Sequence, residues 1–309
     1  MRSDGGVHDT AITVTADDVR RLLAAQAPQW AELPIAPIKE HGTDHRLFRL
    51  GCDLLVRMPV NPGAASQALS DARWLPHVAP YLPVPAPLPQ FIGVPDDSFP
   101  LPWSIVPWLP GTAVSDPLAP GATGDDLAIL AETLGEFVAA LQQVDPGDGP
   151  IATGTARGVP LRNLDERVRA AIKECGSRID QRSVGLAWDR SLEQSQASTL
   201  TWIHGDLMPG NILQHQGQLT AVIDWGTIAI GDPAVDLIPA WQLFGRSRSA
   251  RAQFREIATA GLPEPDAAWE RGRGWTLAQA LIALPYYWDR WPQFARASQR
   301  RIAVALDVE

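Results

Sequence analysis

The stretch Thr201–Asp236, TWIHGDLMPGNILQHQGQLTAVIDWGTIAIGDPAVD, holds the densest set of polar residues in the chain and lies between apolar runs. Asp206 follows a short apolar run, Asn211 lies in the following loop, and Asp224 ends the second strand of a predicted hairpin over 211–223. Two carboxylates and one carboxamide at strand ends suit a Mg²⁺-dependent phosphoryl transfer. The alternative is a hydrogen-bonded hairpin whose aspartates only cap the backbone.

The segments HGDLMPGN (204–211) and IDWG (223–226) resemble the catalytic and metal loops of the aminoglycoside phosphotransferase family. That family includes macrolide and choline-type kinases and shares the protein-kinase fold. The resemblance implies that Asp206 is the catalytic base and that Asn211 and Asp224 bind Mg²⁺. The spacing of all three residues together makes this match far more specific than HGD alone.

Three neighbouring residues are expected to support this loop. Asp232 and Asp236, in GDPAVD, match the segment that follows the metal loop in the family. We expect Asp232 to cap a helix and Asp236 to point back and hold the catalytic loop. For His204 we expect a hydrogen bond that braces the loop against the Asp224 segment, rather than proton transfer.

The resemblance implies an α+β, two-lobed, protein-kinase-like fold. A small nucleotide-binding lobe with an antiparallel sheet would span residues 1–108, and a larger, mainly helical catalytic and substrate-binding lobe would span 109–309. Periodicity and capping signals predict strands near 46–50, 54–58, 88–92 and 104–108. They predict helices near 15–25 (opened by a Thr15–Asp18 capping box), 64–77, 127–144 (opened by a box at 123–126), 163–175 (capped by Asn163), 186–194, 233–244, 249–260, 266–284 and 291–306.

The nucleotide site of the first lobe is expected around Arg57. The kinase fold normally carries a lysine in its third strand, paired with a glutamate of the next helix. Here the strand reads LLVRMP and the helix offers Asp71, so the longer arginine is hypothesised to pair with the shorter aspartate. Either residue is alternatively a surface charge. The turn at Gly42 would cover the phosphates, although a single glycine is also typical of a plain hairpin.

Recognition of the purine is expected from the main chain around Ile105–Trp108, before a hinge-like PWLPG segment. Trp108 is a candidate to stack near the base, but core packing is the preferred interpretation for its side chain. In the second lobe, the aromatic break Tyr286–Trp291 with Asp289 is a candidate lining for the acceptor, with interhelical packing as the alternative.

The composition is that of an ordinary globular protein. The 309 residues carry a net charge of −9, which argues against nucleic acid as a partner and suits a cationic small substrate. Only Cys52 and Cys175 are present, and they form neither a metal-ligand spacing nor a disulfide framework. No apolar run suggests a secretory signal or a membrane span, so a cytoplasmic location is expected.

The sequence therefore predicts a phosphotransferase that moves the γ-phosphate of ATP or GTP to a hydroxyl of a small molecule, with Mg²⁺ as cofactor. An aminoglycoside-type antibiotic is the first choice of acceptor. A macrolide or a metabolite alcohol is the alternative, and a nucleotide-binding pseudokinase is a further one, supported only by the departures at Arg57 and Asp71. The segment after Asp224 is too short for a peptide-binding activation segment. The oligomeric state stays open.

Overall fold

The computed structural model describes residues 12–38, 44–118 and 127–307. The chain forms two compact units. The first comprises residues 1–80 and 85–110, and the second comprises residues 81–84 and 111–309. The predicted α+β class is confirmed, with an antiparallel sheet in the first unit and a largely helical second unit.

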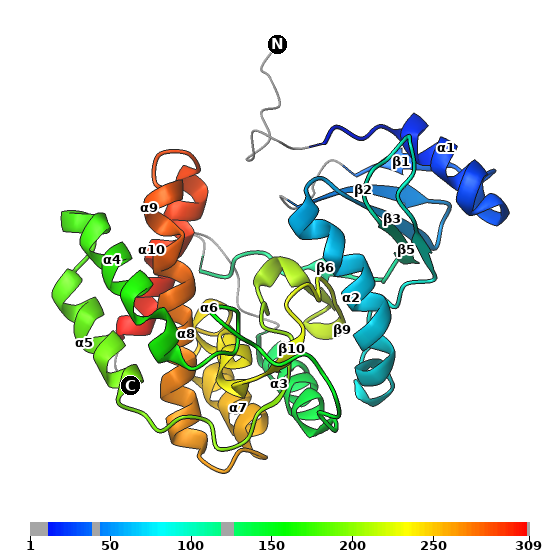
Figure 1. Cartoon of the computed structure of the whole chain (residues 1–309). Helices are drawn as coiled ribbons and strands as arrows, with labels where there is room; N and C mark the ends of the chain where they lie inside the picture. The colour runs from blue at the N-terminus through cyan, green and yellow to red at the C-terminus, as the bar shows by residue number, and fades with distance from the viewer. Residues whose placement is uncertain (1–11, 39–43, 119–126, 308–309) are drawn as a thin grey trace. The chain divides into compact units, whose positions relative to one another are not determined.

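The first unit is built on a five-stranded antiparallel sheet (Figure 1). Its spatial order is β1-β2-β3-β5-β4, with β1 at Ile35–Pro37, β2 at His45–Leu50, β3 at Leu54–Pro59, β4 at Phe91–Gly93 and β5 at Trp103–Pro107. The central strand β3 is paired on both sides, so Arg57 lies opposite Leu47 of β2 and Ser104 of β5. A sheet position between two partners fixes the backbone from which the Arg57 side chain extends.

Two long helices accompany this sheet. In α1 (Ala16–Gln26), Thr15 and Asp18 form the predicted capping box, and Val19, Leu22 and Leu23 enter a core shared with the strands. Helix α2 (Pro62–Val78) begins after Asn61, whose side chain accepts a hydrogen bond from Ala64 N. Because α2 packs on β3, β4 and β5, it carries Asp71 to the sheet position of Arg57.

The second unit holds two small sheets that present the loop residues. Strands β7 (Thr201–Ile203) and β10 (Ala229–Gly231) form an antiparallel pair. Strands β6 (Thr112–Ala113), β8 (Ile212–His215) and β9 (Gln218–Val222) form a second sheet. The predicted hairpin and its turn are confirmed, because Gln216 and Gly217 connect β8 to β9 with positive φ angles of 50° and 79°.

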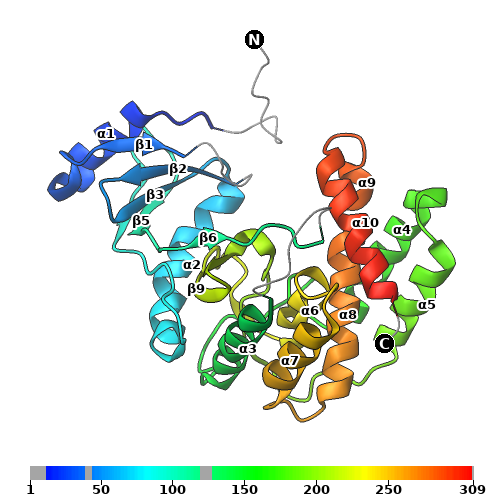
Figure 2. The ribbon, with the colours of Figure 1, turned by 180° about the vertical axis from the view of Figure 1, so that it is seen from behind.

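The helices of the second unit pack around α8 (Pro265–Ile282), which is buried along most of its length. Its neighbours in space include α4 (Asp165–Cys175), α5 (Gln181–Leu192) and α10 (Pro292–Leu306), as Figures 1 and 2 both show. Helix α3 (Leu127–Gln143) packs on α7 (Arg248–Thr259), and the short helices α6 (Pro239–Gln242) and α9 (Leu284–Tyr287) complete the unit. No helix in the described ranges is long and apolar enough to span a membrane.

Three local predictions in this unit are corrected. Asn163 does not cap α4: it lies in a 3₁₀ turn, Leu161–Leu164, and its side chain donates to Gly154 O. Helix α5 begins earlier than predicted because Asp180 caps it through Ser183 N. The helix predicted over 233–244 is a 3₁₀ turn, Pro233–Leu237, followed by α6, because a proline at 239 supplies no backbone donor. The predicted capping box at 123–126 lies outside the described residues.

Candidate active site

The loop that carries Asp206 is held by a buried carboxylate. Asp236 is only 2% exposed, and its two oxygens accept hydrogen bonds from His204 N and Gly205 N, each at 2.7 Å. Burial raises the pKa of Asp236 to about 7, although the two N–H groups oppose that shift. The predicted holding role of Asp236 is therefore what the structure shows.

The loop that carries Asp206 requires glycine at position 205, because neighbouring side chains leave no room for a Cβ atom there. Its φ is +80°, and a Cβ there would lie 2.9 Å from both Arg157 Cβ and Thr227 Oγ1. Thr227 Oγ1 in turn donates to His204 O at 2.6 Å. The catalytic loop is thus tied to the segment after the metal loop on one side and to the 151–158 loop on the other.

His204 braces the catalytic loop against the strand that ends at Asp224. The ring is fully buried, and burial lowers its pKa to about 4, so it is neutral near pH 7. Nδ1 accepts from Asp206 N at 3.2 Å, which places the proton on Nε2, and Nε2 donates to Ile223 O at 3.1 Å. This is the bracing role that the sequence predicted, and it leaves no free nitrogen for proton transfer.

Asp206 has a neutral amide donor on one side and a cationic guanidinium group on the other. Asn211 Nδ2 donates to Asp206 O at 2.9 Å and to Asp206 Oδ2 at 3.2 Å. On the other side, Arg157 Nη2 lies 3.6 Å from Asp206 Oδ1. Burial raises the pKa of Asp206, Arg157 opposes the shift, and Asp224 adds to it. A carboxylate with a raised proton affinity is better suited to accept a proton from a hydroxyl.

Asn211 and Asp224 fit the requirements of a Mg²⁺ site. Because Asn211 uses Nδ2 toward Asp206, its amide oxygen is the atom left to face a cation. Asp224 adopts a left-handed backbone with φ 63°, and such strain in a non-glycine residue typically marks a functional position. Within the described ranges, no cluster of three or more His, Cys, Asp or Glu side chains could hold a metal. Mg²⁺ here would therefore take phosphate and water as its remaining ligands.

Asp232 has a second partner besides its predicted cap. Its side chain accepts from Ala234 N, which confirms the cap, but it also forms a buried ion pair with Arg271 of α8. The Arg271 Nε to Asp232 Oδ2 distance is 2.7 Å, and Nη2 lies 3.2 Å from Oδ1. This two-point contact fixes the segment that contains Asp236 to the central helix.

In the first unit, Arg57 and Asp71 form the hypothesised pair. Arg57 Nη1 lies 2.8 Å from Asp71 Oδ2, and both side chains are buried. The pair rules out the interpretation of either residue as an isolated surface charge. It orients the guanidinium, but its role toward a nucleotide stays a prediction.

The structure places the other predicted nucleotide residues differently. Ile105 lies inside the sheet with a fully buried side chain, and its carbonyl accepts from Gln90 N. Recognition of a purine by the main chain around Ile105–Trp108 stays a prediction. The preferred interpretation of Trp108 as a core residue is wrong: its side chain is 41% exposed, with Arg49 stacked 3.8 Å from the ring centroid. The prediction for Gly42 lies outside the described residues.

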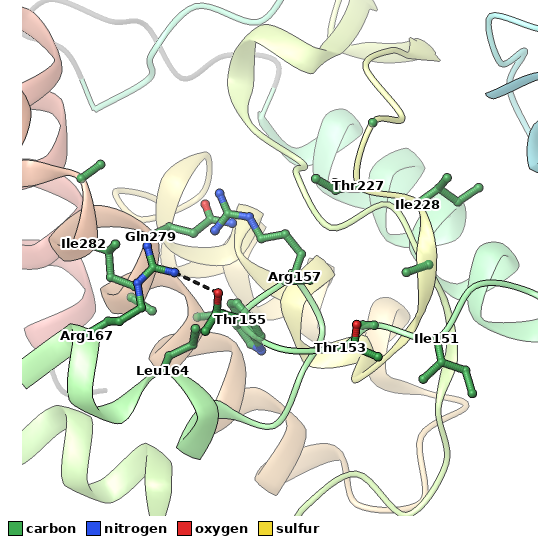
Figure 3. Close-up of a pocket in the computed structure, with 17 residues that line it drawn as sticks. Ile151, Thr153, Thr155, Arg157, Leu164, Arg167, Thr227, Ile228, Gln279 and Ile282 are labelled. Atoms are coloured by element: carbon green, nitrogen blue, oxygen red, sulfur yellow. Dashed lines mark hydrogen bonds between the residues drawn. The ribbon is translucent and has the colours of Figure 1, made fainter. Parts of the chain in front are cut away.

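A pocket of about 490 Å³ lies beside the catalytic loop within the second unit. It is formed mainly by the 151–157 loop, α4, residues 226–229 and the end of α8 (Figure 3). Arg157 contributes to its wall and also approaches Asp206, so the pocket adjoins the carboxylate. The aromatic break of the sequence packs as a separate ring cluster that includes Tyr287, Trp291 and Phe294, and it does not line this pocket.

Sequence reasoning missed Arg157, Thr227 and Arg271. Arg157 sits in a loop that shows only a Gly/Pro/Thr-rich composition. Its contact with Asp206 spans 49 residues of sequence, and no spacing rule joins two such positions. Thr227 directly follows the IDWG segment and had a local signal, since a hydroxyl next to a metal loop often bonds to neighbouring backbone.

The fold is that of protein-kinase-like phosphotransferase structures. The family model described as "phosphotransferase enzyme family" matches residues 35–275. The chain therefore belongs to the phosphotransferase enzyme family. No curated protein matches the chain in a sequence search.

Solved structures share the fold at low sequence identity. The GDP and kanamycin complex of an APH(2″) enzyme is 18% identical with a TM-score of 0.70, covering 93% of this chain and 97% of that chain. The apoenzyme of macrolide 2'-phosphotransferase MphH from Brachybacterium faecium is 22% identical with a TM-score of 0.61, covering 93% and 97%. A ternary complex of APH(4)-Ia with ADP and hygromycin B is 18% identical with a TM-score of 0.59, covering 92% and 97%.

Proposed function

We propose that this protein transfers the γ-phosphate of a nucleoside triphosphate to a hydroxyl of a small molecule. The observation that carries the proposal is the arrangement around Asp206. One carboxylate with a raised pKa lies beside a pocket and accepts a hydrogen bond from the carboxamide of Asn211. The backbone carbonyl of Asn211 accepts from Ile223 N, directly before a second aspartate with a left-handed backbone. Family membership supports the same reaction class.

In the proposed reaction, the hydroxyl oxygen of the acceptor attacks the γ-phosphorus as its proton passes to Asp206. The bond between the γ-phosphorus and the β–γ bridging oxygen breaks, and the nucleoside diphosphate leaves with that oxygen. Arg157, 3.6 Å from Asp206, keeps positive charge next to the site where the phosphoryl group would carry negative charge. Positioning and charge stabilisation supply most of the rate for a transfer of this kind.

Asn211 and Asp224 would hold Mg²⁺, which supplies positive charge against the phosphate oxygens. For the first unit, we propose that Arg57 binds the α- and β-phosphates with its guanidinium oriented by Asp71. The donor is ATP or GTP: the names of the similar structures include GDP as well as ADP and AMP-PNP complexes. A reaction that consumes a nucleoside triphosphate fits a cytoplasmic enzyme.

The acceptor is the open part of this proposal. An aminoglycoside was the first expectation, and the structures with kanamycin and hygromycin B show that this fold accommodates such compounds. Another similar structure is named a macrolide 2'-phosphotransferase, which supports an acceptor of a second class. At these identities the likeness establishes the fold alone, so the lining of the pocket has to guide the choice of acceptor.

The test is the Asp206→Asn variant, which keeps the size of the side chain and removes the proton acceptor. We expect turnover, measured as acceptor-stimulated or basal release of nucleoside diphosphate, to fall by roughly 10²–10⁴-fold, as for loss of a general base. Affinity for the Mg²⁺-nucleotide should stay within a few-fold by calorimetry. A folded variant with normal turnover would refute the base assignment.

The same assay separates an enzyme from a pseudokinase. If the wild-type protein binds nucleotide but releases no diphosphate with Mg²⁺ present, the chain is a nucleotide-binding module. A matched control is Asp148→Asn, because Asp148 is an exposed carboxylate outside the site and its loss should leave turnover unchanged.

A further inference from the structure

The pocket beside Asp206 is cationic although the whole chain carries a net charge of −9. Two arginines, Arg157 and Arg167, line it, and none of the residues described around it is an aspartate or a glutamate. Figure 3 shows that the two side chains extend toward the same pocket from different segments, the 151–158 loop and α4. The local charge is thus opposite in sign to the global charge.

The two arginines differ in how far their charge is compensated. Arg157 lies 3.6 Å from Asp206, which neutralises part of its charge. Arg167 Nη1 donates to a neutral hydroxyl, Thr155 Oγ1, at 3.1 Å, and no ion pair joins Arg167 to a carboxylate of the described residues. Arg167 therefore supplies the uncompensated positive charge of this pocket.

The two guanidinium groups also repel each other. Burial lowers the pKa of Arg157, Asp206 opposes that shift, and the charge of Arg167 lowers the pKa further. Two like charges directed into one pocket without an intervening acid raise the free energy of the ligand-free protein. A bound anion would relieve that cost, because it would interact favourably with both groups.

The remaining wall supplies hydrogen-bond donors and apolar surface. Gln279 Nε2 and Trp275 Nε1 are buried, and neither has a hydrogen-bond partner among the described residues. Both side chains line the pocket, together with Ile151, Leu164, Ile228 and Ile282. Buried donors without partners are costly, so they favour a ligand with acceptor oxygens.

We propose that the acceptor substrate carries an anionic oxygen group, a carboxylate or a phosphate, that Arg167 and Arg157 bind while the acceptor hydroxyl faces Asp206. This inference rests on the proposed phosphotransfer function and specifies its substrate class. It disfavours polycationic aminoglycosides at this pocket, because none of the described residues that line it is an acid and the adjoining Asp206 already faces Arg157.

The test compares the binding of alcohols that share a scaffold and differ only in charge. One set is 4-(hydroxymethyl)benzoate, the neutral 1,4-benzenedimethanol and 4-(aminomethyl)benzyl alcohol; a second set is glucuronate, glucose and 6-amino-6-deoxyglucose, which differ at C6. Affinities are measured by ligand-observed NMR titration with the nucleotide present. The expected order in each set is carboxylate, then neutral alcohol, then amine, with about a tenfold step where one charge-assisted hydrogen bond is gained.

Two variants assign the preference to the pocket. Arg167→Gln should weaken binding of the carboxylate members about tenfold and leave the neutral members unchanged. Lys173→Gln removes one positive charge from an exposed position of the same helix, outside the pocket, and should change neither. Carboxylates that bind no better than the amines, carboxylates that do not bind, or equal behaviour of the two variants would overturn the proposal.

Failure of this proposal is distinguishable from failure of the proposed reaction. Basal release of nucleoside diphosphate that depends on Asp206 tests the reaction and needs no acceptor. If that release persists while carboxylates show no preference, the phosphotransfer function stands and the anionic acceptor class is wrong. If the release is absent from the wild-type protein but carboxylates bind through Arg167, the pocket assignment stands without the reaction.

Discussion

Replacing Asp236 by asparagine removes one acceptor from a carboxylate that holds two backbone N–H groups. The carboxylate oxygens accept from His204 N and Gly205 N at 2.7 Å. Asparagine has the same shape but only one acceptor oxygen, so its NH₂ group would face one of the two donors. The site is buried, and water does not replace the lost partner.

The contacts of Asp236 determine the size and the sign of the expected change in the free energy of unfolding. A buried donor left without a partner costs about 1–3 kcal/mol, so we expect a loss of about 2 kcal/mol in the free energy of unfolding near pH 5. Burial raises the pKa of Asp236 to about 7, above the ordinary value of 3.8 for an aspartate carboxyl. The folded state therefore binds more protons than the unfolded state between these values, and wild-type stability falls as the pH rises through that window.

The asparagine variant lacks this titration. The difference in stability between wild type and variant should therefore shrink as the pH rises, by at most about 1.4 kcal/mol per pH unit. Starting from about 2 kcal/mol near pH 5, this slope brings the difference to zero at about pH 6.5. Urea unfolding followed by tryptophan fluorescence at a series of pH values measures both curves, with Asp148→Asn as a control for the loss of a surface carboxyl.

Two results would refute this reasoning. Equal stability of wild type and variant at every pH would mean that Asp236 does not hold the catalytic loop. A difference that grows with pH would mean that the two N–H groups outweigh burial and that the pKa of Asp236 is lowered in the folded protein. In both cases the bracing of Asp206 would need another explanation.

Three further substitutions test other parts of the site. Asp224→Ala should lose at least about tenfold in Mg²⁺-dependent nucleotide affinity, because it removes a charged ligand, and unchanged calorimetry with Mg²⁺ would exclude a metal role. Arg57→Lys should retain part of the turnover. Arg57→Ala should lose most of the turnover, because it also leaves Asp71 buried without this cation. Near-normal rates for both variants would exclude a phosphate contact by Arg57. Gly205→Ala should lower the melting temperature and the turnover together, since its Cβ would meet Arg157 and Thr227 at 2.9 Å; an unchanged melting temperature would show that the loop relaxes freely.

The sequence predicted what depends on local chemistry. The hairpin over 211–223 follows from alternating apolar residues and a Gln-Gly turn, and the cap at Asp232 follows from an aspartate before proline. The bracing roles of His204 and Asp236 were predicted from their positions in the sequence, and the structure shows them as hydrogen bonds. The pairing of Arg57 with Asp71 was predicted from the resemblance to the kinase fold, with the longer cation compensating for the shorter acid.

What the sequence did not predict depends on contacts distant along the chain. Arg157 reaches Asp206 from a loop with no motif of its own, and Arg271 reaches Asp232 from a helix 39 residues away. Ile105 was assigned to the nucleotide site from its position before a hinge, but pairing with β3 and β4 places it in the sheet interior. The helix predicted over 233–244 is divided into the 3₁₀ turn Pro233–Leu237 and helix α6 because Pro239 lacks a backbone N–H. The continuous apolar pattern of this segment favoured one uninterrupted helix and did not indicate the break.

The left-handed backbone at Asp224 limits which mutations this position can accept. Only glycine and asparagine enter that conformation at comparably low cost, and both arise from aspartate by a single nucleotide change. Glycine removes the side chain and asparagine removes the charge, so neither preserves a carboxylate for a cation. Glutamate keeps the charge but must adopt the strained backbone with a longer side chain. Neither glycine nor asparagine keeps both the backbone geometry and the charge of Asp224, so each should abolish the proposed Mg²⁺ site.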